Sequence, residues 1–171
     1  MMLPEVTNWV RGISVRNSGE SIKAGIERAR MEALRRNTSM SLWLVTDPTG
    51  KNLTNACALD SNGTSWVVSG MDPGGKCAAS PSATALPLLV ERWASSDGAN
   101  AVKVSATDAN GDAADHVSFT SLGQVSPAPG SATRIDIEHA KGGRSLRVTI
   151  DVGGAVRLCD PGVGADDPRR C

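Results

Sequence analysis

Four cysteines of this 171-residue chain could form disulfide bonds or bind a metal ion: Cys57, Cys77, Cys159 and Cys171. None forms a CxxC pair and no histidine is grouped with them, so their spacing disfavours a zinc site. Four cysteines allow three disulfide pairings. Local pairing, Cys57 with Cys77 and Cys159 with Cys171, would close two short loops and stabilise the fold by about 3 kcal/mol each. The alternative is four free core thiols, but Cys171 is the last residue, so we expect disulfides and an oxidising compartment.

Neither the histidines nor the sequence motifs of the chain indicate an enzyme. The chain contains no GxSxG elbow, P-loop, GxGxxG or HExxH motif. His116 and His139 fall on expected strands, and either could act as a general base, but neither lies beside a nucleophile motif. The sequence therefore favours surface-strand histidines and predicts a protein that is not an enzyme and holds no cofactor.

The stretch Asp108–Asp115 has acidic or amide residues at alternate positions, as at the start of an EF-hand calcium loop. Phe119, however, occupies the position of the bidentate glutamate, and no helical pattern flanks the loop. Asn110-Gly111 favours a hairpin turn instead. We expect no metal site here.

Charge is balanced, with 18 basic and 18 acidic residues, so net charge does not indicate nucleic-acid or membrane-surface binding. Arg157, Arg169 and Arg170 lie near the expected Cys159–Cys171 loop, where they could contact phosphates. Three aspartates of the same loop can neutralise them, and no aromatic residue is interleaved for base stacking. DNA contact through these arginines is thus an alternative to solvated surface charge.

Residues 21–37 form the one long helical pattern of the chain, and this helix must position the strands of residues 40–158. Charged residues such as Arg30 and Glu32 fall off its apolar stripe, so we expect them in water. Arg35 and Arg36 suit the last turn, and Asn37 suits the end of the helix. The face expected to pack on the rest of the domain consists of Ile22, Ile26, Ala29 and Ala33.

A second apolar set precedes this one at the same helical spacing: Val6, Trp9, Val10 and Ile13. If one helix runs over residues 4–37, the two sets point in roughly opposite directions, and the first would meet a different partner. Alternatively, the helix breaks at residues 17–20, with Asn17 as cap and Glu20 completing a capping box, and residues 4–16 fold back on the core.

After Asn37 the pattern changes to strands and turns. No run of about 18 apolar residues is present. We expect one α+β domain over residues 1–171, with a helix at 4–37, a β body at 40–158 and a disulfide-closed loop at 159–171. The expected strands are residues 40–46, 65–69, 101–106, 116–121, 133–138, 145–151 and 155–159, with 88–94 either a strand or a helical turn.

Both ends of the chain resemble one family. Residues 24–37, Ala-Gly-Ile-Glu-Arg-Ala-Arg-Met-Glu-Ala-Leu-Arg-Arg-Asn, are similar to the helix that precedes the β body in minor pilins and pseudopilins of the GspH/FimT/FimU group. The ending, Val-Arg-Leu-Cys159-Asp-Pro followed by Asp167-Pro-Arg-Arg-Cys171, resembles that family's closing pattern, most closely the FimU type. The resemblance implies a pilin-like fold, one long N-terminal helix packed on antiparallel sheets.

The resemblance also implies a function, that of a structural minor pilin that primes assembly of a type IV pilus or sits at its tip. Its partners would be other minor pilins and the major pilin, reached through the face of Val6, Trp9, Val10 and Ile13. The family pattern includes an apolar N-terminal anchor, which this sequence lacks, so we expect the sequence to be the soluble part of an anchored protein. The resemblance places that protein in the inner membrane, facing the periplasm, and then at the pilus tip. A type II secretion pseudopilin is an alternative within the same family.

A DNA-binding minor pilin for DNA uptake is the other alternative. Some FimT-type members carry a Gly-Arg-x-Arg motif ahead of the first C-terminal cysteine. The matching positions here are Gly154-Ala155-Val156-Arg157, so one of the two arginines is present. This departure favours the structural interpretation.

Overall fold

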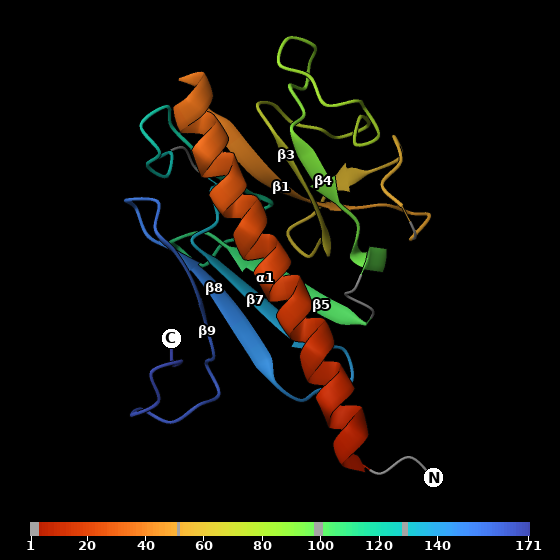
Figure 1. The fold of residues 1–171 in the computed structure, drawn as a ribbon, viewed down its shortest axis with the longest axis vertical. Coiled ribbons are helices and arrows are strands. Elements are labelled where there is room, and N and C mark those ends of the chain that lie inside the picture. The colour runs from red at the N-terminus through yellow and green to blue at the C-terminus, as the bar shows by residue number, and fades with distance from the viewer. Residues whose placement is uncertain (1–3, 51, 98–100, 128–129) are drawn as a thin grey trace.

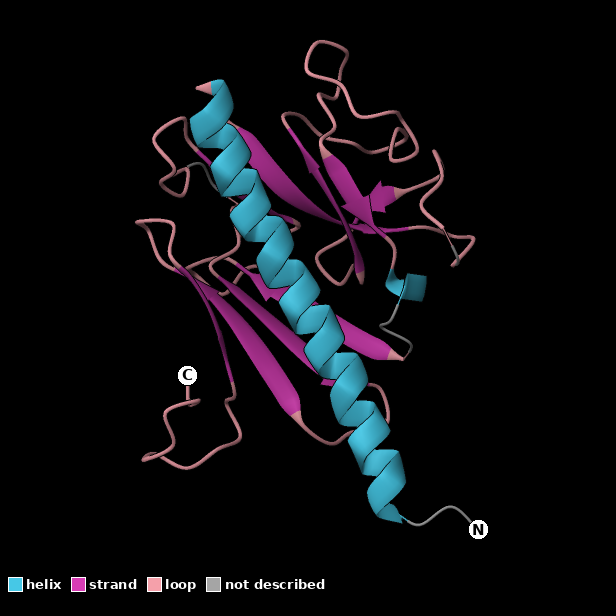
Figure 2. Ribbon diagram, viewed as in Figure 1, coloured by secondary structure: helices cyan, strands magenta, loops and turns pink. Residues whose placement is uncertain are grey.

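The computed structural model describes the backbone of residues 4–50, 52–97, 101–127 and 130–171, and the side chains of these residues except 4–8 and 97. One long helix lies diagonally across two antiparallel sheets (Figure 1). Figure 2 shows that the helix covers the sheets from one side, so its outward surface is not overlaid by other elements. The helix therefore has one face on the β body and one face toward solvent.

Helix α1 (Pro4–Arg36) is continuous, so the alternative of a break at residues 17–20 is wrong. Proline suits the first helical turn because its missing N–H would be unpaired there in any case. The helix ends one residue before the expected end. Asn37 takes the left-handed conformation, with φ of 50°, and the N–H of Thr38 donates to the Ala33 carbonyl at 3.3 Å.

The first sheet is built around β1. Strand β3 pairs along most of β1, β6 pairs with the N-terminal residues of β1, and β2 pairs with its last two residues. β4 extends the sheet beyond β3. All pairings are antiparallel. The strands are β1 (Met40–Thr46), β2 (Ala58–Leu59), β3 (Ser65–Ser69), β4 (Glu91–Trp93) and β6 (His116–Phe119).

The second sheet is a four-stranded antiparallel sheet in the order β5-β7-β8-β9. Buried and more exposed residues alternate along β5, β7 and β8, as expected when one face of a sheet packs on a core. The expected hairpin of the last two strands is present. The strands are β5 (Val102–Thr107), β7 (Arg134–His139), β8 (Ser145–Ile150) and β9 (Val156–Cys159), and a short 3₁₀ helix, η1 (Ser95–Asp97), precedes β5.

Helix α1 bridges the two sheets at two glycines. A Cβ added to Gly25 would lie 2.6 Å from Leu42 of the first sheet, and one added to Gly19 would lie 3.1 Å from Leu158 of the second. Close approach of the helix to each sheet therefore depends on a missing side chain. The main core lies between α1 and the two sheets.

A smaller core covers the outer face of the first sheet. Cys57 and Cys77 belong to it, together with Val45, Val67 and Leu89. This second layer explains why all five residues of β3 are buried. Strand β2 was not among the expected strands, because Ala58–Leu59 is too short to show alternation within a polar stretch.

Candidate functional site

The N-terminal half of α1 carries exposed apolar side chains. Trp9 is 68% exposed, Val10 51% and Ile13 38%. The side chain of Val6, the fourth member of this expected face, lies outside the described residues. Large apolar side chains in water favour contact with another apolar surface, and an unpartnered helix face of this kind fits a helix or groove of a second protein.

The C-terminal half of the same helix is packed on the β body. Met31 and Leu34 of this half are 61% and 45% exposed, but four other apolar residues are fully buried and belong to the main core, together with Val15 from the preceding turns: Ile22, Ile26, Ala29 and Ala33. Because the helix is continuous, these side chains and those of the N-terminal half project to opposite sides. Figure 1 shows the β body on only one of these sides.

Glu32 is a charged residue of α1 that was expected in water but is buried. Its side chain is 4% exposed and accepts hydrogen bonds from Arg35 at 2.6 Å and Arg36 at 2.7 Å, while Arg28 lies 3.5 Å away. The Arg35 hydrogen bond, partly opposed by burial, is the largest cause of a lowered Glu32 pKa. The spacing of three arginines four before and three and four after Glu32 was visible in the sequence and could have indicated this cluster.

Arg30 was also expected in water, but it is half-buried and ties two loops to the helix. Its guanidinium donates to the Gly123 carbonyl at 2.9 Å and the Gly153 carbonyl at 3.2 Å. The residues before these glycines, Leu122 and Val152, are 74% and 80% exposed. No periodic pattern marks such a contact, because its acceptors are backbone atoms 93 and 123 residues away along the chain.

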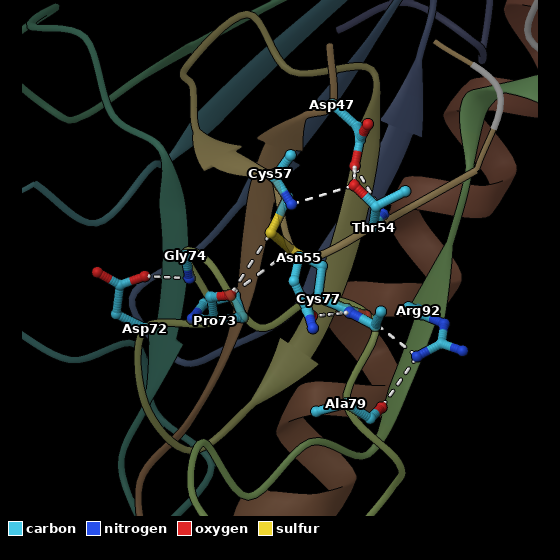
Figure 3. The surroundings of a disulfide bond; sticks show 12 residues. Asp47, Thr54, Asn55, Cys57, Asp72, Pro73, Gly74, Cys77, Ala79 and Arg92 are labelled. Atoms are coloured by element: carbon cyan, nitrogen blue, oxygen red, sulfur yellow. Dashed lines mark hydrogen bonds between the residues drawn. A yellow bond between two sulfur atoms is a disulfide. The ribbon is translucent and has the colours of Figure 1, made fainter. Parts of the chain in front are cut away.

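The disulfide Cys57–Cys77 joins the two ends of a segment that includes β2 and β3, and both cysteines belong to the smaller core on the outer face of the first sheet (Figure 3). Arg92 of β4 donates to the carbonyls of Cys77 at 3.1 Å and Ala79 at 2.9 Å. Nearby, the Asp47 carboxylate accepts from the hydroxyl and backbone N–H of both Thr49 and Thr54. These bonds, led by the Thr49 hydroxyl, lower the pKa of Asp47. The segment is a packed structural unit.

The disulfide Cys159–Cys171 closes the C-terminal loop. Arg157 donates to the carbonyls of Pro168 at 3.3 Å and Arg170 at 2.7 Å, so its guanidinium holds the loop. Arg169 pairs with Asp167 at 2.6 Å, and this bond lowers the pKa of that carboxyl to about 2. Of the three arginines considered for DNA contact, two are thus engaged within the protein.

The histidines and the Asp108–Asp115 stretch have structural partners. His116 lies 2.7 Å from Asp115 and stacks near Trp43, while His139 accepts the N–H of Lys141. Asp108 closes a tight turn by accepting from the N–H of Asn110 and of Asp112, and a single antiparallel bridge, Thr107 to Ala113, follows it. The expected turn is therefore present, although the strands on its two sides, β5 and β6, belong to different sheets. Among the described residues, no group of three or more candidate ligands could hold a metal ion.

Family comparison decides the class to which this helix and β body belong. The sequence model of the GspH family, described as type II transport protein GspH, matches residues 18–154. The chain belongs to the GspH family. It is a family of structural pilins and pseudopilins. No curated protein sequence matches the chain.

Solved structures with the same fold include two minor subunits. The type IV minor pilin FimU of Pseudomonas aeruginosa aligns with a TM-score of 0.55 at 18% identity, over 90% of this chain and 93% of FimU. The minor pseudopilin EpsH of the Vibrio cholerae type 2 secretion system aligns with a TM-score of 0.52 at 13% identity, over 88% of this chain and 99% of EpsH. The pilin-like fold expected from the sequence is confirmed. No helix within the described residues has the length and apolar content needed to cross a membrane.

Proposed function

We propose that this GspH-family protein is a structural minor pilin that primes assembly of a type IV pilus or occupies its tip. The observation that carries the proposal is the exposed face of Trp9, Val10 and Ile13 on a helix whose other face holds the β body. A subunit built in this way keeps its own fold with one part of α1 and offers the other part to neighbouring subunits. Val6 belongs to the same proposed face.

The proposal includes the partners and the location. Other minor pilins and the major pilin are the neighbours that would cover the exposed face, and residues 1–171 act as one pilin-like domain. The family resemblance supports an inner-membrane protein that faces the periplasm before assembly and reaches the cell surface in the filament. Two disulfides fit that oxidising route. No catalytic step is part of this function.

A type II secretion pseudopilin is the second candidate. It is favoured by the description of the matching family model and by the structural likeness to EpsH. The chemistry of the helix face would be the same in both cases, because both functions require packing against pilin-type subunits.

DNA binding for uptake receives little support from the geometry. The guanidinium of Arg157 donates to two loop carbonyls, and that of Arg169 pairs with Asp167. Arg144, another cation of this region, pairs with Asp160 at 2.7 Å. These three engaged arginines offer less attraction to phosphates than free ones would.

Deletion of the gene, followed by complementation, tests the proposal. We expect loss of surface pili with normal protein secretion, and restoration by the wild-type gene. A variant with Trp9→Asp and Ile13→Asp should fold normally but fail to restore pili, whereas Leu86→Asp, at a 59% exposed loop position, should restore them. Loss of secretion with normal pili would favour the pseudopilin, and no effect on either would contradict both.

A further inference from the structure

Gly12 is a helix glycine that the protein's own packing does not explain. A Cβ added at Gly12 would meet nothing within 4 Å, whereas Gly19 and Gly25 allow α1 to approach the sheets. Glycine is the poorest helix former after proline, so a glycine inside a helix carries a cost that normally has a packing reason. Within the described residues Gly12 has no such reason.

The residues around Gly12 form a hole on the helix surface. Trp9, Gly12, Ile13 and Arg16 stand at positions i, i+3, i+4 and i+7, the arrangement that receives one side chain of a facing helix in knobs-into-holes packing. A glycine in such a hole lets a second helix approach closely. Trp9, Ile13 and Arg16 are exposed, so the rim is accessible.

The hole opens into a cavity of about 190 Å³ between α1 and the C-terminal loop. Gly12 and Arg16 line its helix side, Leu146 and Leu158 give it an apolar floor, and Arg169 stands on the loop side. An aliphatic or aromatic side chain entering beside Gly12 would therefore bury apolar area against this floor.

Charge on the cavity wall selects among possible occupants. Three arginines and two carboxylates line it. Arg144 is paired with Asp160, which is itself buried, and Arg169 is paired with Asp167 outside the lining. Arg16 has no ion pair within the described residues, so an occupant that brings a carboxylate beside Arg16 is complementary. Glu20, one turn on, makes the same wall unfavourable for a carboxylate placed further along the helix.

We infer that the Gly12 hole is a close crossing point for an α-helix of another pilin subunit. That helix would place one large apolar side chain over Gly12 and a carboxylate within one turn of it, beside Arg16. The inference rests on the proposed function, since it names the contact by which the exposed half of α1 meets its neighbour. A contact of this kind also involves the C-terminal loop, because Arg169 and the loop form one wall of the cavity.

The test is photo-cross-linking in cells that make the filament, with p-benzoylphenylalanine in place of Glu20 on the cavity wall. We expect a cross-linked peptide from the N-terminal helix of another pilin, with an acidic residue within four positions of the link. The reference position is Val152, which is 80% exposed and outside the cavity. Links from position 20 to a β region, or to a protein that is not a pilin, would overturn the inference.

Gly12→Leu, which fills the hole, provides the sharper measurement. We expect at least a tenfold loss of the position-20 cross-link, while Ala24→Leu, at an exposed helix position outside the cavity, leaves it unchanged. The thermal midpoint of the isolated Gly12→Leu protein should stay equal or rise, because leucine favours helix and no atom lies within 4 Å of the added Cβ. Undiminished cross-linking in a folded Gly12→Leu protein would overturn the inference but not the proposed function. Absence of cross-links to any pilin from either position 20 or position 152, with the protein missing from filaments, would overturn both the inference and the proposed function.

Discussion

The two halves of α1 share one continuous helix but have opposite environments. Residues 18–36 bury four apolar side chains completely and leave Met31 and Leu34 exposed, whereas residues 9–16 bury Val15 alone and leave Trp9, Val10 and Ile13 exposed. Tertiary packing explains the helical state of the second half. The first half keeps helical structure and apolar residues without a comparable cover, so those residues contribute little to the stability of the isolated protein.

The largest difference between the halves should come from shortening one isoleucine in each. Ile26→Ala removes a fully buried side chain and should lower the free energy of unfolding by about 2–5 kcal/mol. Ile13→Ala, at a 38% exposed position, should change it by less than about 0.5 kcal/mol. Urea denaturation of the two variants measures both values. Comparable losses would mean that the first half is packed on the protein in solution, which would contradict its availability to a partner.

The two disulfides allow a second comparison, between a bond inside the smaller core and a bond that closes the C-terminal loop. Cys57 and Cys77 are both buried in the smaller core, so replacing both with serine should cost about 3 kcal/mol or more in global stability. Cys171 is exposed at the end of the chain, so the Cys159→Ser, Cys171→Ser protein can release its terminal loop and should lose less. Denaturation curves and limited proteolysis distinguish the two outcomes. Equal global losses with an uncut terminal loop would show that this loop is part of the core.

Glu32 sharpens the comparison further, since it is a buried charge in the packed half. Glu32→Gln should cost about 1–3 kcal/mol at neutral pH, because Arg36 loses its charged partner. The folded-state pKa of Glu32 is lowered below its ordinary value of 4.5, so its contribution is complete above that pH and is lost as pH falls through the folded pKa. The gap between wild type and Glu32→Gln should therefore narrow in acid. A difference in unfolding free energy that stays constant down to strongly acidic pH would show that the ionised form of Glu32 does not stabilise the fold. Lys23, paired with Glu27 at the surface at 3.4 Å, offers Glu27→Gln as a control with little effect.

The sequence predicted the features that depend on local pattern. The continuous helix, the buried stripe and most strands followed from apolar spacing, and the turn at Asn110-Gly111 followed from residue type. The structure also contains the two local disulfides. In each of these cases the interacting residues are close in sequence or repeat at a fixed period.

The features that the sequence did not predict depend on distant or missing atoms. Arg30 bonds to backbone carbonyls of two remote loops, so no side-chain pattern marks it. Gly12 is informative because nothing lies near it, which requires a structure to recognise. Glu32 was expected to be exposed because it is charged, although three arginines stand at helical spacing from it and can pair with it.

The smallest effect is expected at the loop beside the first half, where Arg157 holds backbone carbonyls. Arg157→Ala should leave binding to duplex DNA unchanged in a gel-shift experiment at low and moderate salt, because this guanidinium is already engaged with the Pro168 and Arg170 carbonyls. Its removal should instead speed proteolysis of the terminal loop, whose closure then relies on the disulfide and Arg144–Asp160. Tight, salt-sensitive binding that disappears in the Arg157→Ala protein would reverse this ranking. Arg157 would then bind a DNA phosphate in preference to the loop carbonyls. The C-terminal loop would become a contact surface for DNA, in addition to the helix face that contacts other subunits.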